Sequence, residues 1–260
     1  MEVHHPHHPS HKKKWSEYIL EFFMLFLAVT LGFFAENVRE SINKNEREIE
    51  TIITLKQNLV KDTIRLNYLT TEYINTYESW VDSSHYYINH LNAKGNERII
   101  IRSLFNATSW QTFYPPEFAY NLIQNPEAMN LLKNKNLKSE LLNYASLLKT
   151  YSEYGKFIIN TCQDVDTSFT HLCYPKDIRI IINKLVYSPN HFLNLNDMPS
   201  DLVLKTYDKK DFLHYLEKVD YADFKLKDID FNYHEILNET KLLLNVINKE
   251  YPDLNSLVIK

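Results

Sequence analysis

Glycine is scarce in this sequence. Only Gly32, Gly95 and Gly155 occur among 260 residues, whereas glycine makes up roughly 7% of an average protein. A phosphate-binding loop needs two or three glycines within about six residues, because only glycine lets backbone amides come close to a phosphate. No two glycines here are closer than sixty residues. The scarcity therefore argues against Walker and Rossmann motifs, the glycine-rich loop of kinases and the G-x-S-x-G motif of hydrolases.

An excess of basic charge is missing as well. Lysine and arginine number 29 and aspartate and glutamate 33, which gives a formal net charge of −4. Because nucleic-acid binding relies on a basic stripe or face, we expect no nucleic-acid partner. Charged residues at 24% and hydrophobic residues at 44% are typical of a folded chain. The 18 tyrosines and 14 phenylalanines predict a sizeable core.

Long apolar runs are absent except near the N-terminus. Between residues 18 and 35 the only acidic or basic residue is Glu21, and about 17 to 25 mainly apolar residues suffice for a helix to cross a bilayer. We predict a cytoplasmic tail at residues 1–14 and a transmembrane helix at residues 15–38. The residues expected at the cytoplasmic lipid interface are Lys12, Lys13, Lys14, Trp15 and Tyr18. Since cytoplasmic flanks carry the cationic excess, this order predicts a cytoplasmic N-terminus and places the rest of the chain across the membrane.

Two other interpretations of this segment compete. A cleaved signal peptide has the same order of zones, but Phe33 would occupy position −3 of a cut after Ala35, where a small residue is required. A buried core helix of a soluble protein is the second alternative, and three lysines followed by Trp15 favour membrane entry over it. We therefore expect an uncleaved signal anchor.

One face of the predicted span carries small residues. Ala28, Gly32 and Ala35 follow one another at steps of four and three, a spacing that lets a second membrane helix come close. Self-association through this face is one interpretation, and the general frequency of small residues in membrane helices is the other. Glu21 shares the face. Because it lies in the first turns of the apolar run, a structural role at the interface is favoured over proton or ion transfer.

The rest of the chain is predicted to be helical. Residues 39–92 contain no glycine or proline, and their apolar residues recur at helical spacing, so we expect a long juxtamembrane helix there. This helix could form a coiled coil or pack into its own bundle. Residues 93–260 are predicted to form a periplasmic helical domain, which gives an all-α fold. Gly95 and six proline-containing turns divide this domain. The expected helices are 97–108, 117–124, 126–133, 137–170, 176–187, 208–221 and 230–251, with irregular stretches at 189–205 and 222–229.

Few residues suggest a reaction. Cys162 and Cys173 would lie outside the cytoplasm, where a disulfide is allowed, and free buried thiols are the alternative. Together with His171 they would supply only three ligands at a non-standard spacing, so no zinc site is expected. One other group shares a face of a predicted helix: His214, Glu217 and Asp220. Exposed helix surfaces commonly carry such residues, and a histidine-rich tail at residues 4–11 is typical of a disordered segment with weak metal affinity. We predict no catalytic site, no metal site and no cofactor.

Two stretches resemble a family of membrane proteins. Residues 12–40, KKKWSEYILEFFMLFLAVTLGFFAENVRE, and residues 118–151, FAYNLIQNPEAMNLLKNKNLKSELLNYASLLKTY, cover about a quarter of the chain. They resemble uncharacterised single-pass membrane proteins of Bacteroidota that carry a domain of unknown function. In residues 118–151, NPEA stands where those proteins often have a serine-glycine turn. The resemblance implies an inner-membrane protein with a helical periplasmic part, and it implies no activity.

These observations predict a membrane-anchored interaction or scaffold module of the bacterial inner membrane rather than an enzyme. Its expected partners are membrane lipids and either a second copy of the chain or another envelope protein. A periplasmic sensor that signals through a partner is an alternative, since the short cytoplasmic tail holds no output domain. A hydrolase of unknown type, suggested only by scattered histidines and carboxylates, is a further alternative.

Overall fold

The computed structural model describes residues 14–114, 117–185 and 192–256, and over this part of the chain the fold is all-α, as predicted. The chain divides into two compact units, residues 1–51 and residues 52–260. Lys12, Lys13 and the histidine-rich tail lie outside the described residues.

Helix α1 (Trp15–Tyr68) forms the first unit from residue 15 onward and continues into the second unit. The other elements are η1 (Leu69–Tyr73), α2 (Ile74–His90), α3 (Glu97–Thr108), α4 (Glu117–Gln124), α5 (Pro126–Leu131), α6 (Lys135–Leu172), α7 (Pro175–Leu185), η2 (Leu195–Asp197), α8 (Lys209–Glu250) and η3 (Pro252–Ser256).

The first unit contains a helix that is long and apolar enough to cross a membrane. An 18-residue window of it has a mean hydropathy of 2.1, and none of that window is buried within the chain. The alternative of a buried core helix is therefore not supported. After the apolar window, Arg39 Nη2 pairs with Glu36 Oε1 at 2.6 Å and Lys44 Nζ with Glu40 Oε1 at 2.6 Å. Such pairs, three and four residues apart, stabilise a helix surface in water.

The predicted juxtamembrane helix does not end where the compact units divide. Residues 39–90 are helical, but from Ile52 onward they belong to the second unit. Ile52, Leu55, Leu59 and Leu66 are fully buried at helical spacing, so this stretch packs into the core of the unit. The expected boundary at residue 92 thus differs from the structural division after residue 51. Of the two predicted arrangements, packing into the bundle is confirmed for this part.

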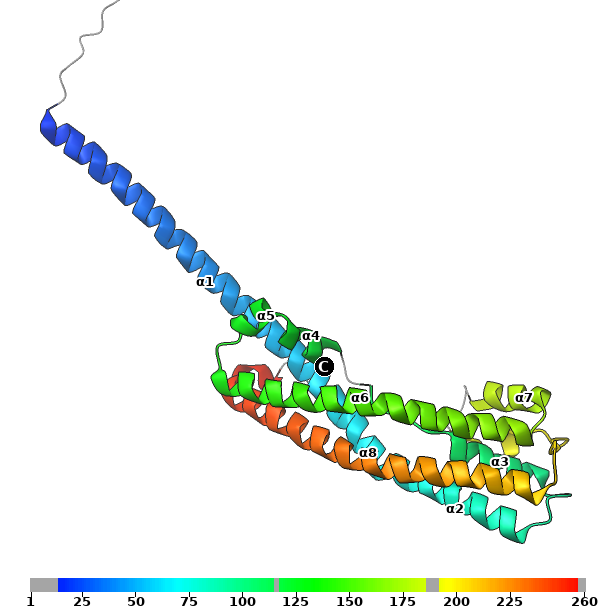
Figure 1. Ribbon diagram of the computed structural model, residues 1–260. Coiled ribbons are helices and arrows are strands. Elements are labelled where there is room, and N and C mark those ends of the chain that lie inside the picture. Colours follow the sequence, from blue (N-terminus) through cyan, green and yellow to red (C-terminus); the bar gives the residue numbers. More distant parts are fainter. Residues whose placement is uncertain (1–13, 115–116, 186–191, 257–260) are drawn as a thin grey trace, which may run out of the picture. The chain divides into compact units, whose positions relative to one another are not determined.

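Helices α6 and α8 lie side by side along the second unit, and α2 packs against α3 and α8 (Figure 1). The prediction of an irregular stretch at residues 222–229 is wrong, because α8 runs unbroken through it. No glycine or proline interrupts this stretch, and Ala222, Leu226 and Ile229 are buried at steps of four and three. Continuous burial of one face therefore keeps the helix intact where its sequence is rich in aspartate.

Two helix boundaries follow the predicted signals. Gly95 has a φ of +87°, a conformation that glycine adopts without steric cost, and it lies between α2 and α3. Asn125 caps α5, because its side-chain oxygen accepts from the amides of Glu127 at 3.0 Å and Ala128 at 3.2 Å. Pro126 occupies the first turn after this cap, where its missing N–H costs nothing. These turns position the long helices.

A π-helical turn, η1, separates α1 from α2 in the core. Tyr73 at its end is buried, and its hydroxyl donates to the carbonyl of Ser109 at 3.2 Å. The same hydroxyl accepts from the amide of Gln111 at 2.6 Å. A buried backbone outside a helix has polar groups that need partners. Tyr73 therefore supplies partners for the irregular segment that follows α3, residues 109–113.

Tyr151 of α6 and Tyr233 of α8 supply partners for the last two residues of the same segment. The Tyr151 hydroxyl donates to the carbonyl of Phe113 at 2.9 Å, and the Tyr233 hydroxyl accepts from the amide of Phe113 at 2.9 Å. The two hydroxyls are 3.2 Å apart, and the Thr112 hydroxyl lies 2.5 Å from that of Tyr151. Burial raises the pKa of both tyrosines. Three tyrosines from three elements thus connect residues 109–113 to the bundle.

Candidate functional site

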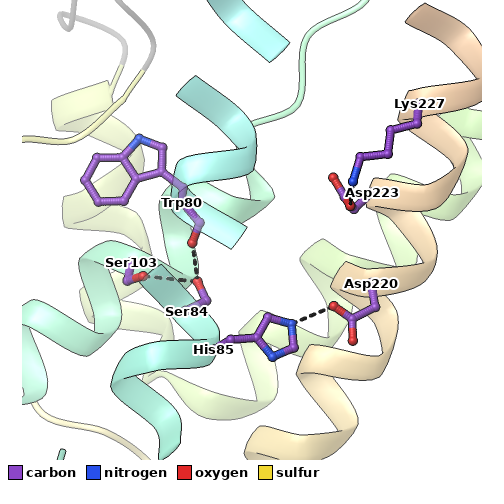
Figure 2. Close-up of polar contacts among 7 residues, drawn as sticks. All are labelled: Trp80, Ser84, His85, Ser103, Asp220, Asp223 and Lys227. Carbon is purple, nitrogen blue, oxygen red and sulfur yellow. Dashed lines mark hydrogen bonds and ion pairs between the residues drawn. The ribbon is translucent and has the colours of Figure 1, made fainter. Parts of the chain in front are cut away.

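Two polar contacts connect α2 to α8 along the surface of the second unit, and Figure 2 shows the one between His85 and Asp220. His85 Nε2 lies 2.6 Å from Asp220 Oδ1, and Lys227 Nζ lies 3.4 Å from Glu78 Oε1. Going from Glu78 to His85 advances seven residues, and going from Lys227 to Asp220 goes back seven. The pairs are therefore two helical turns apart on two antiparallel helices. Lys227 Nζ also binds Asp223 Oδ2 at 2.8 Å, within α8.

A serine pair connects α2 to α3, and its α2 member, Ser84, directly precedes His85 in the chain. Ser84 Oγ donates to the carbonyl of Trp80 at 2.9 Å and lies 3.1 Å from Ser103 Oγ (Figure 2). Both serines are fully buried, so the small hydroxyls allow close helix contact while they satisfy each other. Ser84 thus connects α2 to α3 directly beside His85, which contacts α8.

A solvent-open groove of about 570 Å³ lies between α6 and α8, and Asp220 is one of its lining residues. We call it the α6–α8 groove. Three of the lining residues, Asp164, Glu217 and Asp220, carry carboxylates, and one, Lys218, carries an ammonium group. Asp220 also contacts His85, and Lys225 lies beside the lining rings of Tyr221 and Phe224. The groove residues in full are Thr161, Asp164, Glu217, Lys218, Asp220, Tyr221 and Phe224. The groove therefore favours a cationic occupant.

An exposed aromatic patch adjoins the groove. Its rings are Phe157 of α6 and Tyr221 and Phe224 of α8, which are 46%, 49% and 58% exposed. Lys225 Nζ lies 5.7 Å from the ring centres of Phe157 and Tyr221 and 4.9 Å from that of Phe224. A cation over an aromatic face is attracted by the ring quadrupole. The chain itself thus places an ammonium group among these rings, while their outer surfaces remain in water.

Of the predicted membrane-anchor residues that the structure describes, all lie on α1 in the first unit except Lys14, which directly precedes it. Trp15, Tyr18 and the other large apolar side chains of the span are exposed. A Cβ added at Gly32 would meet no atom within 4 Å. The face with Ala28, Gly32 and Ala35 is therefore accessible to a second helix, and Glu21 lies on the same helix seven residues before Ala28.

The disulfide that the sequence left open is not formed. Cys162 and Cys173 are free and buried. Cys162 lies in α6 and Cys173 directly follows its last residue, so the eleven positions from one to the other correspond to roughly 16 Å along the helix axis, whereas a disulfide needs Cα atoms within about 7 Å. Burial raises the pKa of each thiol to about 12, so both remain protonated and poorly nucleophilic.

The side chains of His214, Glu217 and Asp220, which were predicted to share a helix face, do not form one cluster. His214 Nδ1 lies 3.8 Å from Glu217 Oε2, while Asp220 binds His85 of α2. Over the residues that the structure describes, no group of three histidine, cysteine or acidic side chains is arranged to hold a metal ion. Sequence reasoning found two of the groove carboxylates but missed Asp164, Tyr221 and Phe224. The sequence does carry a signal for the two aromatic residues, because Tyr221 and Phe224 do not share the helical spacing of the buried residues Val219, Ala222 and Leu226.

Comparison with known proteins provides no further assignment. No protein-family model matches the chain, and no curated protein or solved structure is significantly similar to it.

Proposed function

We propose that this protein is a membrane-anchored interaction module whose folded helical unit binds a basic segment of a partner protein in the α6–α8 groove. The observation that carries the proposal is the combination, in one groove, of a carboxylate excess with exposed aromatic rings. Lysine and arginine side chains bind both groups, by ion pairing and by cation–π contact. The position of Lys225 among the rings supports this chemistry.

The proposed anchor is the N-terminal part of α1. Its length, hydropathy and complete exposure support a single membrane crossing. Lys14, Trp15 and Tyr18 precede or begin the span and support a cytoplasmic N-terminus, with the second unit in the periplasm of a bacterial cell. The small face at Ala28 and Gly32 supports self-association of the anchor. Anchoring would hold the groove close to other envelope proteins and raise its effective concentration for them.

A partner with complementary charge gains mainly in association rate and specificity. Charged residues on the rim of an interface steer encounter, whereas buried aromatic residues supply most of the affinity. The carboxylates of Asp164 and Glu217 would take the first role. Tyr221 and Phe224 would take the second, because binding would remove their exposed rings from water.

Site-specific crosslinking tests the proposal. A photo-reactive amino acid replaces Phe224 in the full-length chain, expressed in the native host, and the crosslinked peptides are identified by mass spectrometry. We expect one protein adduct, through a peptide rich in lysine or arginine. The double variant Asp164→Lys and Glu217→Lys should reduce the adduct at least about tenfold, as expected when complementary charges become like charges.

A matched control keeps the same total charge change. The double variant Glu153→Lys and Glu235→Lys alters exposed carboxylates of α6 and α8 that do not line the groove, and it should leave the adduct within twofold. Equal loss in both double variants would reduce the effect to net charge and contradict the groove. An adduct with lipid alone, or with a second copy of the chain through this position, would also overturn the proposal.

A further inference from the structure

A cavity of about 250 Å³ lies where α2 ends and α8 begins. The two helix ends lie at the same end of the second unit (Figure 1). Ile100 and Phe212 are buried and form its apolar floor, and Tyr87 and Leu91 contribute partly buried walls. None of its lining residues lines the α6–α8 groove. The cavity is therefore a separate feature of the bundle.

Two lysines give the mouth of this cavity a positive charge. Lys94 lies in the loop after α2, and Lys209 is the first residue of α8. Lys94 Nζ lies 5.8 Å from the centre of the Tyr207 ring, which also lines the cavity. An apolar floor below two ammonium groups is suited to a molecule with an apolar body and an anionic end.

The loop that carries Lys94 is held by its own polar contacts. The amide of Lys94 donates to Asn92 Oδ1 at 3.1 Å, and Asn96 Nδ2 donates to the carbonyl of Asn92 at 2.8 Å. Gly95 provides the left-handed backbone between them, with a φ of +87°. A loop fixed in this way loses little conformational entropy when a ligand binds.

The carboxylate of Glu97 is bonded to Tyr207, one of the residues that line this cavity. Glu97 Oε1 accepts from the Tyr207 hydroxyl at 2.8 Å, and Glu97 Oε2 accepts from the Gly95 amide at 2.8 Å. Hydrogen bonds to its own amide, to Tyr207 and to Gly95 lower the pKa of Glu97, so it is ionised at neutral pH. Its carboxylate orients Tyr207, and Lys94 and Lys209 are the charged side chains among the described residues that line the cavity.

We infer that the cavity binds a small monocarboxylate with a compact apolar body. The carboxylate lies between Lys94 and Lys209, and the apolar body lies against Ile100 and Phe212. At about 30 Å³ for each water, the cavity holds about eight waters, so the body is limited to about one six-membered ring and a short side chain. This inference is independent of the proposed function, because neither site uses residues of the other.

Calorimetry with three related probes tests the charge requirement. The full-length chain in lipid nanodiscs is titrated with 3-phenylpropionate, with its neutral analogue 3-phenylpropionamide and with the cation 3-phenylpropylamine. Empty nanodiscs are titrated in parallel, since each probe also partitions into lipid. We expect saturable one-to-one binding of the carboxylate, and binding at least about tenfold weaker for the amide and the amine, because a charge-assisted hydrogen bond is lost.

Three variants then locate the site. Ala93→Trp fills the cavity and should abolish binding, while Lys94→Gln combined with Lys209→Gln should weaken binding about tenfold or more. Lys210→Gln removes a neighbouring charge that does not line the cavity, and it should change affinity less than twofold. Circular dichroism of each variant verifies that the helices remain formed.

The inference fails on any of four outcomes. These are no saturable binding of the carboxylate, equal binding of the three probes, binding that survives Ala93→Trp, and a loss with Lys210→Gln as large as that in the double lysine variant. The variant Asp164→Lys and Glu217→Lys should bind the carboxylate normally, which separates this test from that of the groove.

Discussion

Tyr233→Phe tests how the irregular segment at residues 109–113 is held in the core. The substitution removes one hydroxyl and keeps the ring, which packs against Phe113 and Tyr151. The hydroxyl accepts from the amide of Phe113 at 2.9 Å, and Tyr233 and Phe113 are both buried. In the variant, the Phe113 amide would lose its acceptor in a place that water does not reach.

The expected loss follows from the cost of a buried polar group without a partner. Removing one partner of a buried hydrogen bond costs about 1–3 kcal/mol, more than the net gain from the bond itself. We therefore expect Tyr233→Phe to lower the free energy of unfolding by about 2 kcal/mol. For a folded unit of roughly 200 residues, about 2–4 °C of Tm corresponds to each kcal/mol, so Tm should fall by about 4–8 °C.

Denaturation of the full-length chain in mild detergent, followed by circular dichroism, measures this loss. The membrane helix remains helical in the micelle, so the change in signal reports the second unit. Tyr221→Phe is the matched control, because it removes the hydroxyl of a tyrosine that is half exposed, and it should change Tm by less than about 2 °C. If Tyr233→Phe is as stable as the control, the hydroxyl does not support residues 109–113 and the reasoning is refuted.

Two further predictions concern other parts of the molecule. Burial raises the pKa of Asp62 to about 6 from its usual 3.8, although its carboxylate accepts from the Tyr144 hydroxyl at 2.8 Å. The folded state therefore keeps the Asp62 proton to a higher pH than the unfolded state does, so the free energy of unfolding should fall as pH rises from about 4 to about 6. Asp62→Asn should make the free energy of unfolding less dependent on pH in this range, and an unchanged dependence would contradict the prediction. In the membrane helix, Gly32→Ile should reduce crosslinked dimer several-fold because the small face is filled. The control Leu31→Ile, one position along the helix, should not, and equal dimer in both variants would argue against self-association through Gly32.

Local signals explain where the sequence predicted helix ends well. Gly95 and the Asn125-Pro126 pair act within one or two turns of the chain, so their effect is present in the sequence itself. Helix continuity through residues 222–229 depends instead on α6 and on other elements that pack against α8. The division after residue 51 likewise depends on which faces of α1 meet distant helices. The helical spacing of Ala222, Leu226 and Ile229 is present in the sequence, but tertiary packing decides that this face is buried, as it decides the division after residue 51.

The candidate site was only partly predictable for the same reason. Spacing placed Glu217 and Asp220 on one helix face, but the partner of Asp220 is His85, 135 residues earlier. The hydrogen bonds of the buried tyrosines could not be predicted either, because their partners are backbone atoms of the segment after α3, which is far away in the sequence. A count of 18 tyrosines predicts a large core. It does not reveal that the hydroxyls of some of them form hydrogen bonds with backbone groups of residues 109–113.

The scarcity of glycine and the exposed groove are connected through helix length. Helix α8 contains no glycine and runs for 42 residues, and α6 runs for 38 residues with one glycine, Gly155. Helices this long present several turns of each face, and packing α6 against α8 covers only one face of each. At the edge of this contact, Tyr221 and Phe224 of α8 stay in water beside the groove carboxylates. Exposed aromatic rings cost solubility and contribute nothing to the core, so their presence next to an acidic groove favours a surface that a partner covers.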